Sequence, residues 1–206
     1  MIHPHTELRK VSDLIGSGVF ATLPIPKGTI MYVKDPLEVE IPPLRYSSFR
    51  HTYKSIVDRY SYIDPQGARI VSWDIAKFVN HHCDCNTIST GYSFEIAIRD
   101  IAAGEEITDE YGLFNLPEEL LCGCQSPHCR KIISCRDWDL YKEQWDRKAL
   151  DGLSCLKKVP QPLIHYMDQK TRRALNRYLR GMEPYTSVLA LRSVSVKSRS
   201  LKILPR

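Results

Sequence analysis

The sequence has no apolar run that approaches the roughly 20 residues needed to cross a bilayer. Its first residues, MIHPHTELRK, also lack the apolar core of a secretion signal. We therefore expect a soluble, intracellular protein of the cytoplasm or the nucleus, without membrane contact. The chain has 206 residues, 43% of them hydrophobic, and this composition excludes the disordered and fibrous classes. The length fits one domain, or one domain with a small appendage.

Acidic residues are absent from the last fifteen positions, Arg192–Arg206. This segment contains five basic residues. The whole chain has a net charge of +5, so residues 1–191 are formally neutral. The sequence thus assigns the basic character to a tail and not to a nucleic-acid-binding face. We expect this tail to be solvated and flexible; contact with an acidic partner is the alternative.

The seven cysteines do not suit a disulfide framework, because their number is odd and no secretion signal precedes them. Cys83 and Cys85 form C-x-C, and Cys122, Cys124 and Cys129 form C-x-C-x4-C. Thiolates at such short spacing are typical ligands of zinc. Three ligands need a fourth from elsewhere in the chain, and buried free thiols are the simpler alternative.

Short β-rich runs broken by glycine and proline fill the first half of the chain. They predict strand–turn–strand structure within 16–45, a helical or irregular segment over 46–60, and a hairpin around Pro65-Gln66-Gly67. Alternating residues predict a strand within 92–101, and EEIT begins another at 105.

The hydrophobic period changes after the last clustered cysteine. Residues that recur at intervals of three and four, as in an amphipathic helix, are Trp138, Tyr141, Trp145 and Ala149. A second helix is predicted over 168–180, with Asp168 as its N-cap and Gly181 after its end. We interpret the aromatic residues as core packing and the helices as a cap on the β region.

Three further segments combine small or polar residues that suit ligand binding. Gly16-Ser17-Gly18 is a turn at which backbone can approach a ligand closely. Asn80 and His81 follow an apolar run and place two polar side chains at a strand end. The acidic stretch 104–112, GEEITDEYG, closes on a tyrosine. Each segment, taken alone, also has an ordinary structural explanation. Asn80 also suits a turn, His81 a surface position, and Tyr111 a half-buried strand.

In order and spacing, residues 8–135 resemble the SET-domain family of protein lysine methyltransferases with its zinc-binding post-SET extension. Five motifs of the family are matched in order. They are G-x-G at 16–18, i-p-k-G at 25–28, R-F-I-N-H-S-C-x-P-N at 77–86, G-E-E-L-T-x-D-Y-G at 104–112 and C-x-C-x4-C-R at 122–130. The resemblance implies a mainly β, α+β fold, the SET-type β-clip of several short sheets with a knotted C-terminal segment.

The resemblance also implies a division of the chain. We expect a SET domain at 8–118, a post-SET zinc segment at 119–135, a helical region at 136–190 and the basic tail at 191–206. The implied function is transfer of methyl groups from S-adenosylmethionine to the side-chain amine of lysine in a protein substrate, with a histone tail as the commonest analogue. The alternatives are an inactive SET-fold module that binds a protein partner, and transfer to a non-protein amine.

Family members hold the cofactor against the G-x-G turn and the N-H segment. The cofactor-binding residues that this implies are Gly16, Ser17, Gly18, Val19, Phe20, Asn80, His81 and Tyr111. Tyr111 also matches the family's catalytic tyrosine, and Tyr60 or Tyr62 is the candidate that lines the lysine channel. A reference pKa of about 10 makes a permanent tyrosinate costly, so we expect Tyr111 to orient the reacting groups.

Four positions depart from the family pattern. Thr87 stands where many relatives supply the fourth zinc ligand, His82 replaces a serine, and Cys85 replaces a proline. We therefore expect a closed, structural Zn²⁺ site with Cys83 and His82 as fallback ligands. The expected ligands are Cys85, Cys122, Cys124 and Cys129. Asp109 replaces the usual aromatic residue two positions before the tyrosine, which leaves the number of transferred methyl groups open.

Overall fold

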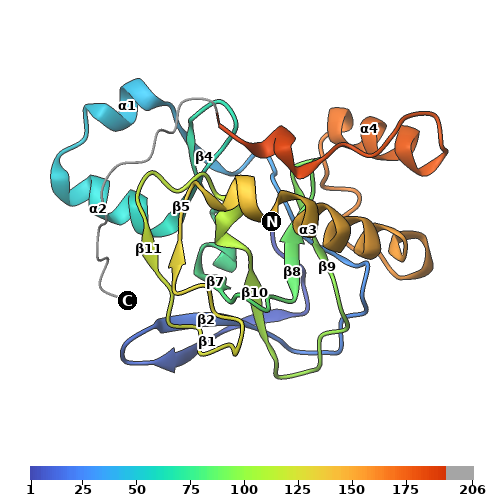
Figure 1. Cartoon of the computed structure of the whole chain (residues 1–206), viewed down its shortest axis with the longest axis horizontal. Coiled ribbons are helices and arrows are strands. Elements are labelled where there is room, and N and C mark those ends of the chain that lie inside the picture. Colours follow the sequence, from blue (N-terminus) through green and yellow to red (C-terminus); the bar gives the residue numbers. More distant parts are fainter. Residues whose placement is uncertain (194–206) are drawn as a thin grey trace.

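The computed structural model describes residues 1–193; residues 194–206, with most of the predicted basic tail, lie outside the described part. The described chain forms small sheets at its centre, with α1 and α2 at one end and α3 and α4 at the other (Figure 1). Among residues 1–193, none of the helices combines the length and the apolar character of a membrane span.

The first sheet joins three motifs that are distant in the sequence. Its strands, in spatial order, are β1 (Thr6–Ser12), β2 (Gly16–Ala21), β10 (Glu106–Asp109) and β7 (Asn80–His81). β10 pairs antiparallel with β2 and parallel with β7. The G-x-G turn, the N-H segment and the acidic motif thereby become neighbours on one sheet.

Two three-stranded sheets and one hairpin complete the β structure of the described residues. The second sheet has the order β3 (Ile30–Val33), β9 (Phe94–Ala97), β8 (Thr87–Ser89), and the third has the order β4 (Val39–Ile41), β6 (Arg69–Val71), β5 (Ser61–Ile63). β11 (Leu120–Leu121) pairs with β12 (Ile132–Ile133). The predicted hairpin is β5–β6, whose turn uses Gly67 at φ +84°.

Three of the helices given below, α2, α3 and α4, lie in segments where helical structure was expected, whereas α1 begins inside 16–45, for which strand–turn–strand structure was predicted. The helices are α1 (Pro43–Ser47), α2 (His51–Tyr60), α3 (Asp137–Leu153) and α4 (Gln169–Leu179). The short 3₁₀ turns are η1 (Ile75–Phe78), η2 (Tyr111–Leu113), η3 (Leu156–Lys158) and η4 (Val188–Leu191). Asp168 caps α4 by accepting a hydrogen bond from the Thr171 N–H at 3.0 Å, and Gly181 follows at φ +69°.

One apolar core joins α3 and α4 to the second sheet. Trp138 and Trp145 are fully buried and meet edge to face, with ring centroids 5.5 Å apart. Burying two such rings anchors α3 against β8 and β9. The α+β fold of short sheets with a helical cap is therefore confirmed.

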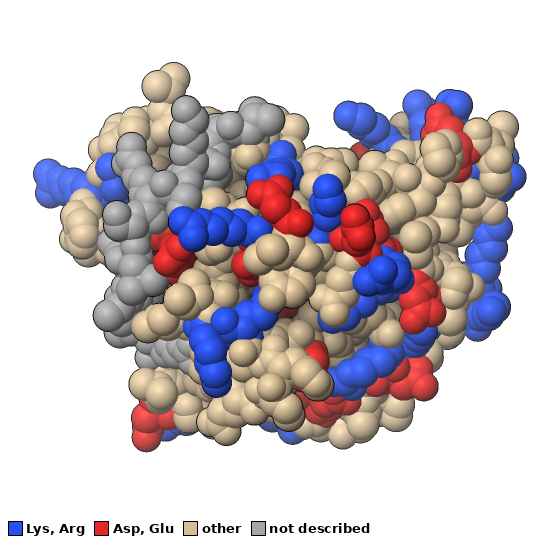
Figure 2. Space-filling view, viewed as in Figure 1, with Lys and Arg blue, Asp and Glu red and all other residues tan. Residues whose placement is uncertain are grey.

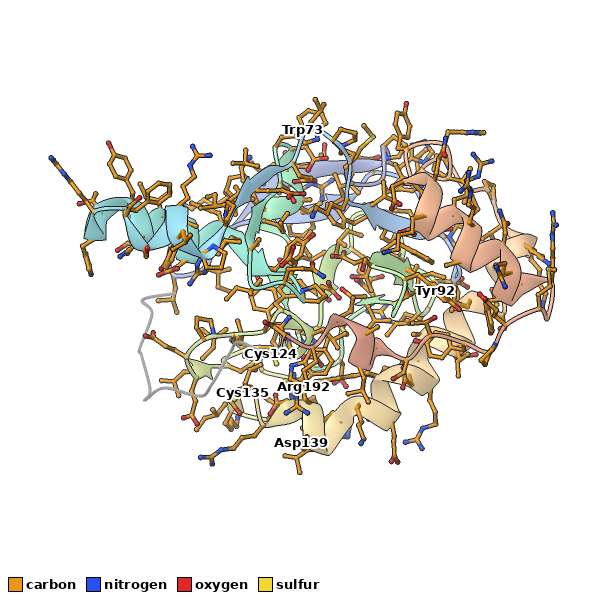
Figure 3. All side chains as sticks on the ribbon, turned by 90° about the horizontal axis from the view of Figure 1, so that it is seen from above. Trp73, Tyr92, Cys124, Cys135, Asp139 and Arg192 are labelled. Atoms are coloured by element: carbon orange, nitrogen blue, oxygen red, sulfur yellow. The ribbon has the colours of Figure 1, made fainter. Side chains whose placement is uncertain are left out.

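Charged side chains of both signs are interspersed over the sheets, whereas Lys and Arg gather over α4 (Figure 2). Arg192, the first basic residue of the predicted tail, pairs with Asp139 of α3 at 2.9 Å (Figure 3). The beginning of that tail is thus held against the helical cap.

Candidate active site and candidate metal centre

A cavity of about 620 Å³ lies where the first sheet, the α2–β5 segment and the β11 hairpin meet. Its walls combine aromatic rings with a few polar and charged groups, and its volume falls within the range of about 300–1,000 Å³ usual for small-molecule sites. The cavity is therefore the candidate active site.

Tyr111 is partly buried at the start of η2, which follows β10 after Glu110. The parallel register sets His81 opposite Asp109, and the His81 ring centroid lies 5.4 Å from that of Tyr111. The Tyr111 hydroxyl donates a hydrogen bond of 2.7 Å to the Val79 carbonyl oxygen. Burial, with the nearby carboxyl groups of Asp109 and Glu95, raises the pKa of Tyr111. Its hydroxyl is therefore protonated at neutral pH and points in a fixed direction.

The His81 ring is neutral, because burial lowers its pKa to about 4. Its Nδ1 lies 2.9 Å from the Asp109 carbonyl oxygen and 3.2 Å from the Tyr111 backbone nitrogen. The nitrogen can donate to the carbonyl or accept from the N–H, according to the tautomer. Either arrangement holds the ring between β10 and η2.

The Asn80 side chain holds the G-x-G turn in place. Its Nδ2 donates to the Ser17 carbonyl oxygen at 3.1 Å and to Glu106 Oε1 at 2.7 Å. A Cβ on Gly18 would overlap the Glu106 carboxylate and lie 2.9 Å from Asn80 Nδ2. Close packing inside the protein therefore requires Gly18, and Asn80 acts at least partly as a positioning residue.

The eight predicted cofactor-binding residues divide into two groups. Those that line the cavity are Gly16, Ser17, Asn80, His81 and Tyr111. Gly18, Val19 and Phe20 lie outside its lining: Val19 is buried in the core, and Phe20 packs under the Arg9 guanidinium at 5.3 Å. Arg59 lines the cavity beside the Gly16 turn, and no sequence motif indicated it.

Both candidate channel tyrosines face the same cavity. The Tyr60 ring lies 5.4 Å from Phe78, and the Tyr62 ring lies 5.7 Å from Phe114. Phe114 in turn stacks on Tyr111 at 5.0 Å. These rings form an aromatic wall that leads from α2 and β5 to the Tyr111 hydroxyl.

Glu95 faces the cavity from β9 and was not predicted. It pairs with Tyr32 across β3 and β9, so both side chains project from the same face of that sheet. The Tyr32 hydroxyl donates to Glu38 Oε1 at 2.8 Å and accepts from Ser72 Oγ at 3.2 Å. The only sequence signal for Glu95 was a carboxylate inside an otherwise apolar strand.

Asp109 is fully buried next to Glu95. Its Oδ1 accepts from the Glu110 N–H, whereas its Oδ2 has no hydrogen-bond partner within the described chain. Burial raises the pKa of Asp109 to about 6, and burial with the Asp109 charge raises the pKa of Glu95 well above its usual value. Two adjacent buried carboxylates do not both ionise, so the pair retains one proton at neutral pH.

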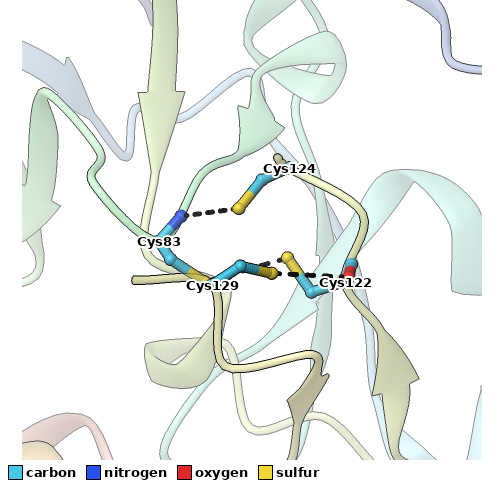
Figure 4. A group of neighbouring side chains, drawn as sticks. All are labelled: Cys83, Cys122, Cys124 and Cys129. Carbon is cyan, nitrogen blue, oxygen red and sulfur yellow. Dashed lines mark hydrogen bonds between the residues drawn. The ribbon is translucent and has the colours of Figure 1, made fainter. Parts of the chain in front are cut away.

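Four cysteine sulfurs converge beside the cavity (Figure 4). The sulfurs of Cys83, Cys122, Cys124 and Cys129 all lie within 4.8 Å of one another. The Cys83 and Cys122 sulfurs are 3.8 Å apart. Zn–S bonds of about 2.3 Å in a tetrahedron place two sulfurs about 3.8 Å apart. The donor set and its spacing therefore fit a closed, structural zinc site.

The β11–β12 hairpin positions three of these sulfurs in a tight loop. The Cys122 N–H donates to the Lys131 carbonyl oxygen at 2.7 Å, and the Cys129 N–H donates to that of Ser126 at 3.0 Å. Gln125 and Lys131 adopt left-handed φ angles of +59° and +65°, which curl the chain back on itself. We call residues 122–130 the cysteine loop.

The fourth sulfur belongs to Cys83, so the expectation that Cys85 completes the cluster is corrected. The chain turns at Cys83 and Asp84, and of the two cysteines only Cys83 belongs to the cluster. Asp84 accepts a hydrogen bond from Ser126 Oγ, which holds this turn against the cysteine loop. Cys85 is only 4% exposed and lies in the core. His82, the second fallback, accepts a hydrogen bond from the Asp84 N–H at 3.1 Å.

Known proteins share the part of the chain that forms the cavity. A family model described as "SET domain" matches residues 16–112. Histone-lysine N-methyltransferase ATX2 of Arabidopsis thaliana is 31% identical over 137 residues, which cover 60% of this chain and 12% of the relative. Histone-lysine N-methyltransferase ash1 of Drosophila melanogaster is 35% identical over 133 residues, which cover 57% of this chain and 6% of the relative.

Histone H3-lysine(4) N-trimethyltransferase ATX1 of Arabidopsis thaliana is 29% identical over 137 residues, which cover 60% of this chain and 13% of the relative. The chain thus spans a small part of these relatives' length. The cysteine cluster, which joins Cys83 inside the matched segment to the cysteine loop that follows it, is compatible with a post-SET extension. The G-x-G turn, the N-H segment and Tyr111 all lie within the match and meet in one cavity. Residues 16–112 of this chain therefore form a SET domain.

Proposed function

We propose that this protein transfers methyl groups from S-adenosylmethionine to the side-chain amine of lysine in a protein substrate, with a histone as the first candidate. One observation carries the proposal: the Gly16–Ser17 turn, His81 and Tyr111 line a single cavity. The relatives named as histone-lysine N-methyltransferases support the same reaction class. A histone substrate favours the nucleus among the expected compartments.

The cavity residues fit the cofactor. When bound, S-adenosylmethionine would supply a methyl group on a sulfonium: an uncharged amine would form a C–N bond to the methyl carbon in line while the C–S bond breaks and the neutral thioether leaves. The Gly16–Ser17 backbone and the Asn80–His81 segment would hold it, and the Arg59 guanidinium suits its carboxylate. Because the His81 pKa is low, the ring adds no positive charge beside a sulfonium cation.

The remaining cavity groups suit the amine. The aromatic wall of Tyr60 and Tyr62 would enclose the aliphatic stem of lysine. The Tyr111 hydroxyl donates to the Val79 carbonyl and keeps oxygen lone pairs for the reacting groups. Since the pKa of Tyr111 is raised, its role is orientation rather than proton removal. The single negative charge of Glu95 and Asp109 would attract the ammonium group.

We propose a structural role for zinc at Cys83, Cys122, Cys124 and Cys129. Four thiolates leave no open coordination position for water, so the ion would take no part in methyl transfer. Cys122 and Cys124 also line the cavity. By holding the cysteine loop, the ion would fix one wall of the candidate active site.

The proposal is tested by incubating the protein with S-adenosylmethionine and a panel of basic proteins that includes histones, followed by mass spectrometry. Methyl-lysine that forms with the wild type and is strongly reduced with Tyr111→Phe is the expected result. Calorimetric titration with S-adenosylmethionine runs in parallel. Absence of both binding and transfer would overturn the proposal and favour the inactive SET-fold module.

A further inference from the structure

Basic residues are concentrated in one segment of the helical cap. Residues 157–180 contain seven lysines and arginines and one aspartate, a net charge of +6. Because residues 1–191 are formally neutral, the rest of that stretch carries −6. The sequence interpretation assigned the basic character to the tail alone. The described residues hold a second basic region that the neutral total concealed.

Three cations of α4 and its C-cap residue form a stripe along one face of the helix. Positions i, i+3, i+7 and i+10 of this face hold Lys170, Arg173, Arg177 and Arg180, and all four are exposed. Residues at these intervals share one side of a helix with 3.6 residues per turn. The opposite side packs on the core: Leu175 is buried, and the Tyr178 ring lies 6.0 Å from Tyr92.

Few acidic groups neutralise this stripe. Within residues 1–193, its one ion pair joins Arg177 Nη2 to Glu183 Oε1 at 2.8 Å. Arg173 donates to the neutral Gln169 side chain at 3.4 Å. Lys157 extends the positive surface at the helix end, where its Nζ donates to the Leu179 carbonyl oxygen at 2.8 Å. We call Lys157 and the stripe together the α4 basic surface, which lies at the opposite end of the molecule from α1 (Figure 1).

We propose that the α4 basic surface binds the phosphate backbone of double-stranded DNA. The stripe runs over ten residue steps, from Lys170 to Arg180, and therefore over about 15 Å of helix. Duplex DNA presents a phosphate charge about every 1.7 Å along its axis. Three of the four side chains of the stripe are arginines, whose planar forks match phosphate oxygens. Binding is expected to be independent of base sequence, because the cationic side chains of the stripe would contact phosphate groups and not base edges.

The composition of the stripe favours a duplex over a single strand. Single-stranded nucleic acid is held by aromatic rings on which the bases stack. The aromatic residue of α4, Tyr178, instead packs inward against Tyr92 and Tyr185. The proposal stands apart from methyl transfer, since these residues lie on a different surface from the cavity lining.

The test is fluorescence anisotropy of a labelled duplex of about 20 base pairs, titrated with the full chain at salt concentrations between about 50 and 200 mM. The triple variant Lys170→Ala/Arg173→Ala/Arg180→Ala should bind about tenfold more weakly, and the slope of log affinity against log salt should fall by about 0.9 per removed cation. Alanine preserves helix propensity, and circular dichroism checks the fold. A milder variant, Lys170→Gln/Arg173→Gln, gives a second measurement in the same direction.

The matched control is Arg45→Ala/Arg50→Ala/Arg136→Ala, which removes three exposed cations from other parts of the surface. It should retain wild-type affinity within about twofold, and both variants should methylate a free peptide at the wild-type rate. Wild-type affinity and salt slope in the triple variant, or an equal loss in the control, would overturn the proposal. So would tighter binding to polyglutamate or to anionic vesicles than to the duplex.

Discussion

The Arg130 guanidinium meets the Glu110 carboxylate at 2.5 Å between Nη2 and Oε1. Arg130 follows Cys129 in the cysteine loop, and Glu110 directly precedes Tyr111. Glu110 is 2% exposed, and its Oε2 also accepts from the Trp145 indole N–H at 3.2 Å. This buried carboxylate therefore ties the candidate metal loop, the candidate catalytic tyrosine and α3 to one another.

Replacing Arg130 should strongly destabilise the protein. Arg130→Met leaves the buried Glu110 and Asp137 carboxylates without their shared partner, so the free energy of unfolding should fall by about 3–5 kcal/mol. Denaturant unfolding measures the change. Arg9→Met is the control, because the Arg9–Glu7 pair is 46% exposed on both sides and its loss should cost about 0–1 kcal/mol. Similar losses in the two variants would contradict a structural role for the buried pair.

Removing the Tyr111 hydroxyl should affect turnover more than cofactor affinity. Tyr111→Phe keeps the ring stacked on Phe114 but loses the oriented hydroxyl, and kcat should fall by about 10²–10³-fold. The Kd for S-adenosylmethionine should change only a few-fold. Steady-state kinetics and calorimetry separate the two effects, and Tyr166→Phe, at an exposed tyrosine, is the matched control. An unchanged kcat would remove Tyr111 from the reaction.

The neighbouring cysteines Cys83 and Cys85 offer a paired test of the metal site. Cys83→Ala should lose bound zinc, whereas Cys85→Ala should keep it, because only the Cys83 sulfur belongs to the cluster. Elemental analysis of the purified variants measures the zinc content. Zinc retained in Cys83→Ala and lost from Cys85→Ala would restore the original ligand prediction.

Removing the metal itself should abolish methyl transfer, since the cysteine loop forms part of the cavity wall. The experiment treats the protein with a chelator, verifies the loss of zinc and then measures turnover. Addition of Zn²⁺ should restore activity in a protein that has stayed folded. Full turnover in a verified metal-free sample would show that the loop needs no ion.

The buried Asp109 should make stability depend on pH in a defined direction. Its pKa is raised to about 6, so between about pH 4 and pH 6 the folded state binds more protons than the unfolded state. The Asp109 contribution to stability is therefore present at low pH and is lost as the pH rises through about 6.

Asp109→Asn removes this loss, and the variant should gain stability relative to the wild type as the pH rises from 4 to 7, by up to about 3 kcal/mol. Thermal unfolding at several pH values provides the measurement. Asp13→Asn, at a side chain that is 94% exposed, is the control. A difference between Asp109→Asn and the wild type that does not change with pH would mean that the carboxyl is neutral or ionised throughout.

Glu95 should act on the amine and not on the cofactor. Glu95→Gln keeps the shape of the side chain and removes the carboxyl group that faces the cavity, so kcat/KM for a lysine peptide should fall by about 10–100-fold. The Kd for S-adenosylmethionine should stay within a few-fold of the wild type. An equal loss of cofactor affinity would instead assign Glu95 to the cofactor side of the cavity.

The sequence predicted those site residues that lie inside contiguous motifs. Asn80, His81 and Tyr111 were found because the neighbouring residues in each motif specify the local chain. Glu95 was missed because it reaches the cavity through strand pairing with Tyr32, sixty-three positions away, and its own segment resembles any half-buried strand. A linear motif does not report such a partner.

Two other differences have local physical causes. The choice between Cys83 and Cys85 depends on a turn at Asp84, which spacing alone does not encode. Strands such as β7 and β11 are two residues long, too short for an alternating pattern to show in the sequence. In contrast, α3 and α4 were predicted because their apolar residues repeat over several turns.

The parallel pairing of β7 with β10 also makes the cavity depend on contacts between distant parts of the chain. The Asn80 amide meets the Ser17 carbonyl across 63 residues, and β10 pairs Thr108 with Asn80 and Asp109 with His81. Such long-range closures are slow, because loop entropy is lost before the contacts form. During synthesis the Gly16–Ser17 turn leaves the ribosome well before Asn80 and β10. The cavity that this turn lines can therefore form only after β10 has emerged.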